Sequence, residues 1–99
     1  MSSRQKETLL SYADDMSAIL EIQSVLRGLT KGHVFTKTLT FEVMKNTPNE
    51  RVPKLLELLC HRGSNAFNVF CRVLKEEGEV ELSYNLLKDS YRKEVEIYW

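Results

Sequence analysis

The sequence predicts an all-α domain, an antiparallel bundle of six short helices joined by tight loops. Apolar residues recur at the three- and four-residue spacing of helices nearly throughout the chain. Glycine, proline, serine and threonine lie between these periodic segments, and no segment has the pattern of a strand hairpin. With 99 residues, the chain has the length of a single domain over 1–99.

Three helices are predicted in the first half of the chain. Apolar residues at i, i+4, i+7 and i+11 indicate the first, over about 5–20: Leu9, Ala13, Met16 and Leu20. Apolar residues at i, i+3, i+4 and i+7 indicate the second, over 22–30: Ile22, Val25, Leu26 and Leu29. The third begins near Thr36 and ends by Asn46, with Phe35, Leu39 and Val43 on one face.

The fourth helix has a clear start signal and an internal proline. Thr47 is a candidate N-cap, Pro48 suits the first helical position, and Glu50 completes a capping box. Pro53 removes a backbone hydrogen bond if the helix begins after Thr47, whereas a start near Asn49 places it at the end of the first turn. Both starts stay open. The buried stripe of this helix consists of Val52, Leu55, Leu56 and Leu59.

Gly63 and Ser64 separate the fourth helix from the fifth, because glycine permits a left-handed helix end and serine caps the next start. The fifth helix, over 65–76, has an apolar stripe wide enough to predict a central position: Ala66, Phe67, Val69, Phe70, Cys71, Val73 and Leu74. A sixth helix is marked by Val80, Tyr84, Leu87 and Tyr91. The remaining tail either extends this helix, with Val95 and Tyr98 on the same face, or frays.

Composition excludes several classes of function. The formal net charge is zero, which argues against nucleic-acid or membrane binding driven by overall charge. No apolar run approaches the roughly 20 residues of a membrane span, and the opening residues lack the apolar segment of a signal peptide. Two cysteines do not make a disulfide framework. We therefore expect a cytoplasmic protein with reduced thiols.

Charge is distributed unevenly along the chain. Residues 1–21 carry two basic and four acidic side chains, 22–75 carry nine and three, and 76–99 carry three and seven. The net charges are −2, +6 and −4, so the middle is basic and the ends are acidic. If the fold keeps these segments apart, the molecule is electrically two-sided and suited to head-to-tail association. The alternative is a solvated surface with uneven charge.

Cys60, His61 and Cys71 raise the possibility of a small redox or zinc module. A structural zinc site needs about four converging ligands, and a reactive thiol needs a base and a polar setting. Cys71 lies on the apolar stripe of its helix, and Cys60 and His61 point about 100° apart if both are helical. The spacing therefore favours packing and surface roles.

A helix-turn-helix that binds nucleic acid is the nearest alternative of another class. It would place a turn at residues 62–64 and use the helix over 65–76 for reading, with Asn65, Asn68 and Arg72 at the polar positions. The apolar face of that helix is too wide for an element that stands clear of the core, and the helix exposes few bases.

One segment carries a family resemblance. The pattern L-L-E-L-L-x-x-R-G-x-x-A-F-x-x-F-C-x-x-L, from Leu55 to Leu74, resembles the signature of the caspase recruitment domain (CARD), a member of the death-fold superfamily. V-F-T, from Val34 to Thr36, is similar to the family's entry to its third helix. The resemblance covers a core of about residues 6–88, which leaves 89–99 as a tail or helix extension. Pyrin and death-effector domains share the six-helix architecture, but the R-G-x-x-A-F-x-x-F segment favours CARD.

The resemblance implies a six-helix Greek-key bundle without enzymatic activity, catalytic residues, cofactor or metal. CARDs bind other CARDs and thereby join initiator caspases, adaptors and nucleotide-binding oligomerisation proteins in apoptosis and innate immunity, often as filaments. We therefore expect homotypic partners and possible self-association. The principal family contact sets a basic surface on the first and fourth helices against an acidic surface on the second and third helices of the partner.

This sequence departs from that polarity, because its second and third helices are basic. We expect one contact surface around the second and third helices: Arg27, Lys31, Lys37 and Lys45. Part of a second consists of Arg51 and Lys54 in the fourth helix, which also carries Glu50 and Glu57. The acidic counterpart consists of Glu76, Glu77, Glu79 and Glu81, and the first helix adds Asp14 and Asp15.

Overall fold

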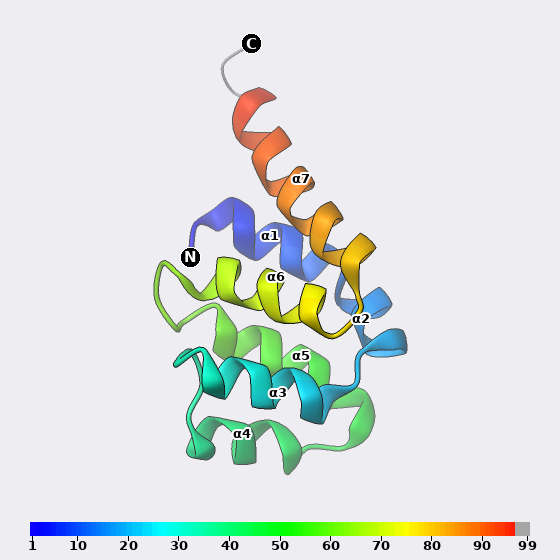
Figure 1. Cartoon of the computed structure of the whole chain (residues 1–99), viewed down its shortest axis with the longest axis vertical. Coiled ribbons are helices and arrows are strands. Elements are labelled where there is room, and N and C mark those ends of the chain that lie inside the picture. The colour runs from blue at the N-terminus through cyan, green and yellow to red at the C-terminus, as the bar shows by residue number, and fades with distance from the viewer. Residues whose placement is uncertain (97–99) are drawn as a thin grey trace.

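The computed structural model describes the backbone of residues 1–96 and the side chains of residues 1–91, and throughout this part every regular element is an α-helix. The all-α prediction is therefore confirmed. The helices are α1 (Ser3–Ser11), α2 (Ala13–Ile19), α3 (Ile22–Lys31), α4 (Lys37–Met44), α5 (Pro48–Leu59), α6 (Ala66–Glu76) and α7 (Val80–Glu96). Figure 1 shows α4 at one end of the bundle and α7 at the other.

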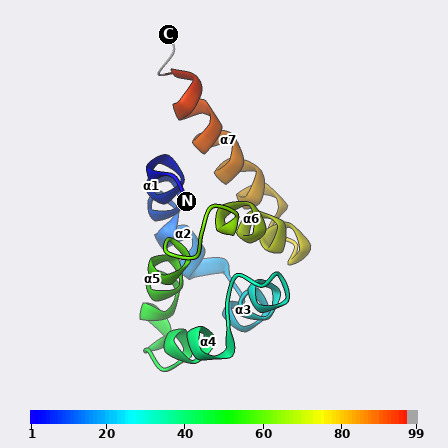
Figure 2. The ribbon, with the colours of Figure 1, turned by 90° about the vertical axis from the view of Figure 1, so that its left-hand side faces the viewer.

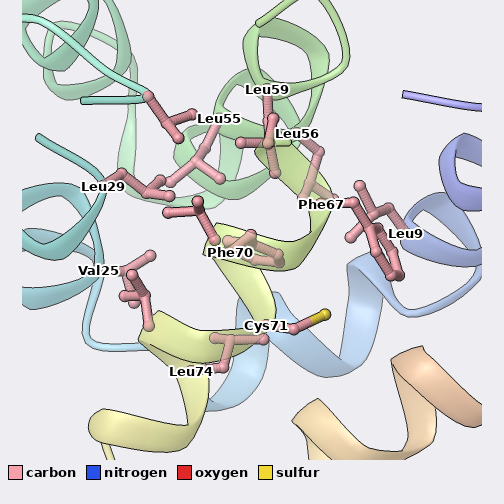
Figure 3. Close-up of a cluster of buried hydrophobic side chains, with 14 of the residues drawn as sticks. Leu9, Val25, Leu29, Leu55, Leu56, Leu59, Phe67, Phe70, Cys71 and Leu74 are labelled. Atoms are coloured by element: carbon pink, nitrogen blue, oxygen red, sulfur yellow. The ribbon is translucent and has the colours of Figure 1, made fainter. Parts of the chain in front are cut away.

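Helix α6 lies at the centre of the bundle, as its wide apolar stripe predicts. It packs against α3 and α7, while α5 packs against α2 and α4, and α1 packs against α7 and α2 (Figure 2). Phe67 and Phe70 are almost fully buried, and Figure 3 shows the side chains of α6 meeting those of α1, α3 and α5. The buried residues of α6 are Ala66, Phe67, Val69, Phe70, Cys71, Val73 and Leu74.

The first predicted helix, over 5–20, is divided into α1 and α2 at Tyr12, whose φ of −102° and ψ of 7° lie outside helical values. Near the break, the hydroxyl of Thr8 donates to the carbonyl of Arg4 and that of Ser11 to the carbonyl of Thr8. Such side chains compete with the helical ladder. Tyr12 is also held by a hydrogen bond from its hydroxyl to the carboxylate of Asp89 in α7. Apolar periodicity continues across the break and therefore did not reveal it.

Helix α5 begins at the earlier of the two positions that the sequence left open, but the predicted capping box is absent. Helix α5 begins at Pro48, so Pro53 lies inside the helix, as the earlier of the two open starts requires. The hydroxyl of Thr47 donates to Oδ1 of Asn49 instead of accepting a backbone N–H, so the capping box is absent. Gly63 has the predicted left-handed conformation, with φ of 102°.

The serine cap predicted for the fifth helix is also absent. Helix α6 begins after Asn65 instead of Ser64, and the Asn65 side chain makes no capping hydrogen bond. By contrast, the hydroxyl of Thr36 accepts a hydrogen bond of 3.2 Å from the N–H of Leu39 at the start of α4. The start predicted near Thr36 is therefore confirmed.

Helix α7 forms as predicted and continues to Glu96, but it buries a different face. The apolar series that marks this helix is exposed: Val80 (54%), Tyr84 (62%), Leu87 (44%) and Tyr91 (69%). The face against α6 and α1 consists of Leu82, Ser83, Leu86 and Ser90. Ser83 and Ser90 are buried, although the hydropathy pattern assigns serines to the surface. The hydroxyl of Ser83 donates a hydrogen bond of 2.7 Å to the carbonyl of Cys71. The expectation for Tyr98 lies outside the described residues.

Candidate partner-binding surface

A groove of about 550 Å³ separates α3 from α4 at the end of the bundle opposite α7. Its α3 wall consists of Gln23, Leu26, Arg27 and Thr30. Its α4 wall consists of Lys37, Thr40, Phe41 and Met44. The volume lies in the range of ligand and peptide pockets. The groove therefore combines an apolar floor with a cation from each wall.

The loop between the two helices sets the position of the walls. His33 adopts a positive φ of 61°, and the apolar side chains of Val34 and Phe35 then enter the core. Arg62 holds the loop from outside, because its Nε donates 2.9 Å to the carbonyl of Val34. These contacts tie the loop that joins the two walls to the turn before α6.

The structure brings two of the four predicted cations of this surface to the groove. Arg27 and Lys37 are exposed, and neither forms an ion pair within the described part of the chain. Lys31 is exposed in the last turn of α3, outside the groove lining, where a positive charge interacts well with the helix end. Lys45 also lies outside the lining and pairs with Glu42 at 2.8 Å.

The pairing of Lys45 has an electrostatic consequence for its partner. Its ammonium group donates a hydrogen bond to Glu42, and this bond together with the positive charge lowers the pKa of the Glu42 carboxyl. Lys45 is therefore partly neutralised, and the positive potential of this end comes chiefly from Arg27, Lys31 and Lys37.

The two cations predicted for a second surface, Arg51 and Lys54, have intramolecular partners. Arg51 donates from Nε to the carbonyl of Asn46 at 3.0 Å and from Nη2 to the carbonyl of Met44 at 3.1 Å. Its guanidinium thus satisfies free carbonyls at the end of α4 and joins α4 to α5. Lys54 is half-buried and lies 3.7 Å from Glu57.

The predicted acidic counterpart gathers around the α6–α7 turn. Glu76 and Glu77 end α6 and are exposed, and Glu76 lies 3.7 Å from Nε of Arg72. Glu79 is half-buried in the turn, and Glu81 is exposed in the first turn of α7, where the helix dipole favours an acid. The turn lies along the flank of the bundle, away from α4 at its end (Figure 1).

Asp14 and Asp15 are separate from that turn in the chain. Both are exposed in the first turn of α2, where their charges suit the helix start that follows the break at Tyr12. The sequence itself indicates this role, because acidic residues are favourable in the first turn of a helix.

Phe41 is the exposed aromatic residue among the groove residues that the sequence did not predict. The residue is 66% exposed, although aromatic side chains gain most from burial. It lies off the stripe of Phe35, Leu39 and Val43 that packs into the core. An aromatic residue outside the buried stripe of its own helix is the signal that could have identified it.

The thiols form no common site. Cys71 is 2% exposed within the core, as the packing prediction requires, and burial raises its pKa to about 12. Partial burial also raises the pKa of Cys60, while His61 is exposed. Among residues 1–91, no three or more His, Cys, Asp or Glu side chains are grouped to hold a metal ion. The helix-turn-helix alternative gains no support either, since α6 is the most deeply packed helix.

Comparison with known proteins finds no family model and no curated protein that matches this sequence. Within the part of the chain that the structure describes, no helix has both the length and the apolar character needed to cross a membrane. The physical properties of the α3–α4 groove therefore carry the functional argument.

Proposed function

We propose that this chain is a caspase recruitment domain that associates with other CARDs in the cytoplasm and has no enzymatic activity of its own. In this proposal α1 and α2 together act as one interrupted helix, and the bundle has the six-helix Greek-key arrangement of the death fold. The partners are initiator caspases, adaptors or nucleotide-binding oligomerisation proteins of apoptotic or inflammatory signalling. Support comes from the resemblance of Leu55–Leu74, a segment that supplies much of the core.

The observation that carries the proposal is the convergence of Arg27 and Lys37 beside an exposed Phe41. The two cations come from different helices, and neither forms an ion pair within residues 1–91. A partner that offers carboxylates around an apolar contact satisfies all three side chains at once. Opposite charges then guide the encounter and set the orientation, while the aromatic ring supplies a buried anchor.

The test is binding of the full chain to three purified CARDs, one each from an initiator caspase, an adaptor and a nucleotide-binding oligomerisation protein. Biolayer interferometry at low and high salt should show that at least one binds, more weakly at high salt. Arg27→Glu and Lys37→Glu should each weaken that binding by roughly tenfold. Lys37 begins α4, where an acid is well tolerated, so Lys37→Glu should leave helicity and thermal stability unchanged.

Lys75→Glu is the matched control, since Lys75 is also exposed at a helix end but lies on α6, outside the groove. It changes the net charge equally and should retain binding. If no CARD binds, or if all three reversals weaken binding equally, the proposal is wrong.

A further inference from the structure

The exposed face of α7 is an apolar surface without a partner in the described structure. Four apolar residues lie at the spacing i, i+4, i+7 and i+11, which places them on a single face of the helix. These residues, which we name the α7 ridge, are Val80, Tyr84, Leu87 and Tyr91. Each of these residues is between 44% and 69% exposed. An apolar series with helical spacing that faces solvent is typical of a helix that docks into a groove.

Charge distinguishes the two ends of this ridge. Glu77, Glu79 and Glu81 lie around its first residue, Val80, and give that end a negative potential. Further along, the ammonium group of Lys88 lies 5.8 Å from the centre of the Tyr84 ring. The ridge is therefore apolar along its length and most acidic at its start.

We infer that the α7 ridge of one copy of this chain docks into the α3–α4 groove of the next copy, so that the chain associates with itself head to tail. The inference deepens the proposed function, on which it rests for the use of the groove as an acceptor. In this contact Arg27 and Lys37 of the groove lie opposite Glu77 and Glu81, which flank the start of the ridge. Phe41 meets the apolar side chains of the ridge. The contact complements charge with charge and apolar surface with apolar surface.

The contact is intermolecular because the two surfaces lie at opposite ends of the molecule. In both views α7 points away from the end of the bundle that α4 forms (Figure 1, Figure 2). A ridge and a groove on one molecule are different surfaces, so the contact is heterologous: each bound copy presents a further free ridge or groove. Each pairwise contact is small and weak, and longer assemblies gain strength because several contacts act together.

Sedimentation velocity of the full chain, over a range of concentrations, tests the inference with two variants that each remove one surface. The groove variant is Arg27→Glu with Lys37→Glu, and the ridge variant is Tyr84→Ala with Leu87→Ala. All four side chains are exposed, and alanine is the best helix former, so both variants should keep the native helicity and thermal stability. The native chain should form assemblies that grow with concentration, and each variant alone should remain monomeric.

Mixing the two variants is the decisive step. The groove variant retains a ridge and the ridge variant retains a groove, so an equimolar mixture should form a dimer that does not extend further. A groove variant that still dimerises alone would show a ridge-to-ridge contact and overturn the inference. A mixture that stays monomeric, or a native chain that never associates, would also overturn it.

Binding of the ridge variant to the CARD panel separates this inference from the proposed function. The ridge variant keeps the groove, so it should bind the same CARD as the native chain. Retained panel binding without head-to-tail complementation rejects only the inference, whereas failure of the native chain to bind any CARD rejects the proposed function. Lys88→Glu is a further check, since it makes the ridge more acidic and should shift the native assembly toward larger species.

Discussion

Gly28 of α3 lies against Val73 of α6 with no space for a side chain between them. A Cβ atom on Gly28 would lie 2.6 Å from Cγ1 of Val73, well inside van der Waals contact. This approach sets the distance between α3 and the central helix, and α3 carries one wall of the groove. The packing of a single glycine thus connects the core to the candidate binding surface.

Gly28→Ala should destabilise the protein although alanine is the better helix former. The substitution gains about 1 kcal/mol in helix propensity. Overpacking costs about 1–3 kcal/mol, and the branched side chain of Val73 has few rotamers with which to move aside. We expect a net loss of up to about 2 kcal/mol in the free energy of unfolding, measured by urea denaturation.

The same substitution should have the opposite sign in a Val73→Ala background. Val73→Ala alone costs about 2 kcal/mol because Val73 is buried, but it removes the methyl group that Gly28→Ala would strike. Adding Gly28→Ala to Val73→Ala should then stabilise by up to about 1 kcal/mol. Additive effects of the two changes would show that α3 and α6 do not meet at this point.

Tyr12 should make stability depend on pH in the alkaline range. Its hydrogen bond to Asp89, its partial burial, and the negative charges of Asp89 and Asp15 together raise the pKa of Tyr12 from 10.0 to about 12. The folded protein therefore favours the protonated phenol. The resulting stabilisation is complete below pH 10 and is lost as the pH rises from 10 to about 12.

Tyr12→Phe is the matched variant for this prediction, because it removes the hydroxyl and keeps the ring. It should cost about 1 kcal/mol near neutral pH. The stability advantage of the native chain over the variant should fall as the pH rises from 10 to about 12, because only the native chain has a phenol to ionise. A difference that is constant across this range, in denaturation curves at several pH values, would contradict the assigned contact.

The two cysteines should react with a thiol reagent at different rates. Burial raises the pKa of Cys71 to about 12 and also blocks access, whereas Cys60 is only partly buried. At mildly alkaline pH we expect a faster phase from Cys60 and a phase from Cys71 that becomes fast only in denaturant. Cys60→Ser should remove the faster phase alone, and a native Cys71 that reacts as quickly as Cys60 would contradict its burial.

Several features could be predicted because they depend on local sequence. Helix α6 and its central position follow from a broad apolar stripe, and Gly63 follows from the need for a left-handed turn. The start of α4 follows from Thr36, whereas the sequence left two positions open for the start of α5. Each of these features depends on residues within one or two helical turns of one another, so the sequence pattern is enough to predict it.

The candidate surface was only partly predictable. Its basic character follows from the excess of basic residues between residues 22 and 75. Arg27 and Lys37, which line the groove, were among the predicted contact residues. The sequence analysis did not identify Phe41 as an exposed residue beside these two cations. It also did not show that Arg51 would donate hydrogen bonds to the carbonyls of Met44 and Asn46. The contacts of Arg51 depend on where α4 and α5 meet, which no short segment determines.

Local sequence decided which segments of this chain are helical, because apolar spacing and turn residues act within each segment. Tertiary packing decided which face each helix buries and which charges remain free. Helix α7 shows the difference. Its apolar spacing correctly indicated a helix, yet α6 and α1 pack against a different face, which carries Leu82, Ser83 and Leu86. The ridge stays outside because a helix at the end of a bundle is covered on one side only.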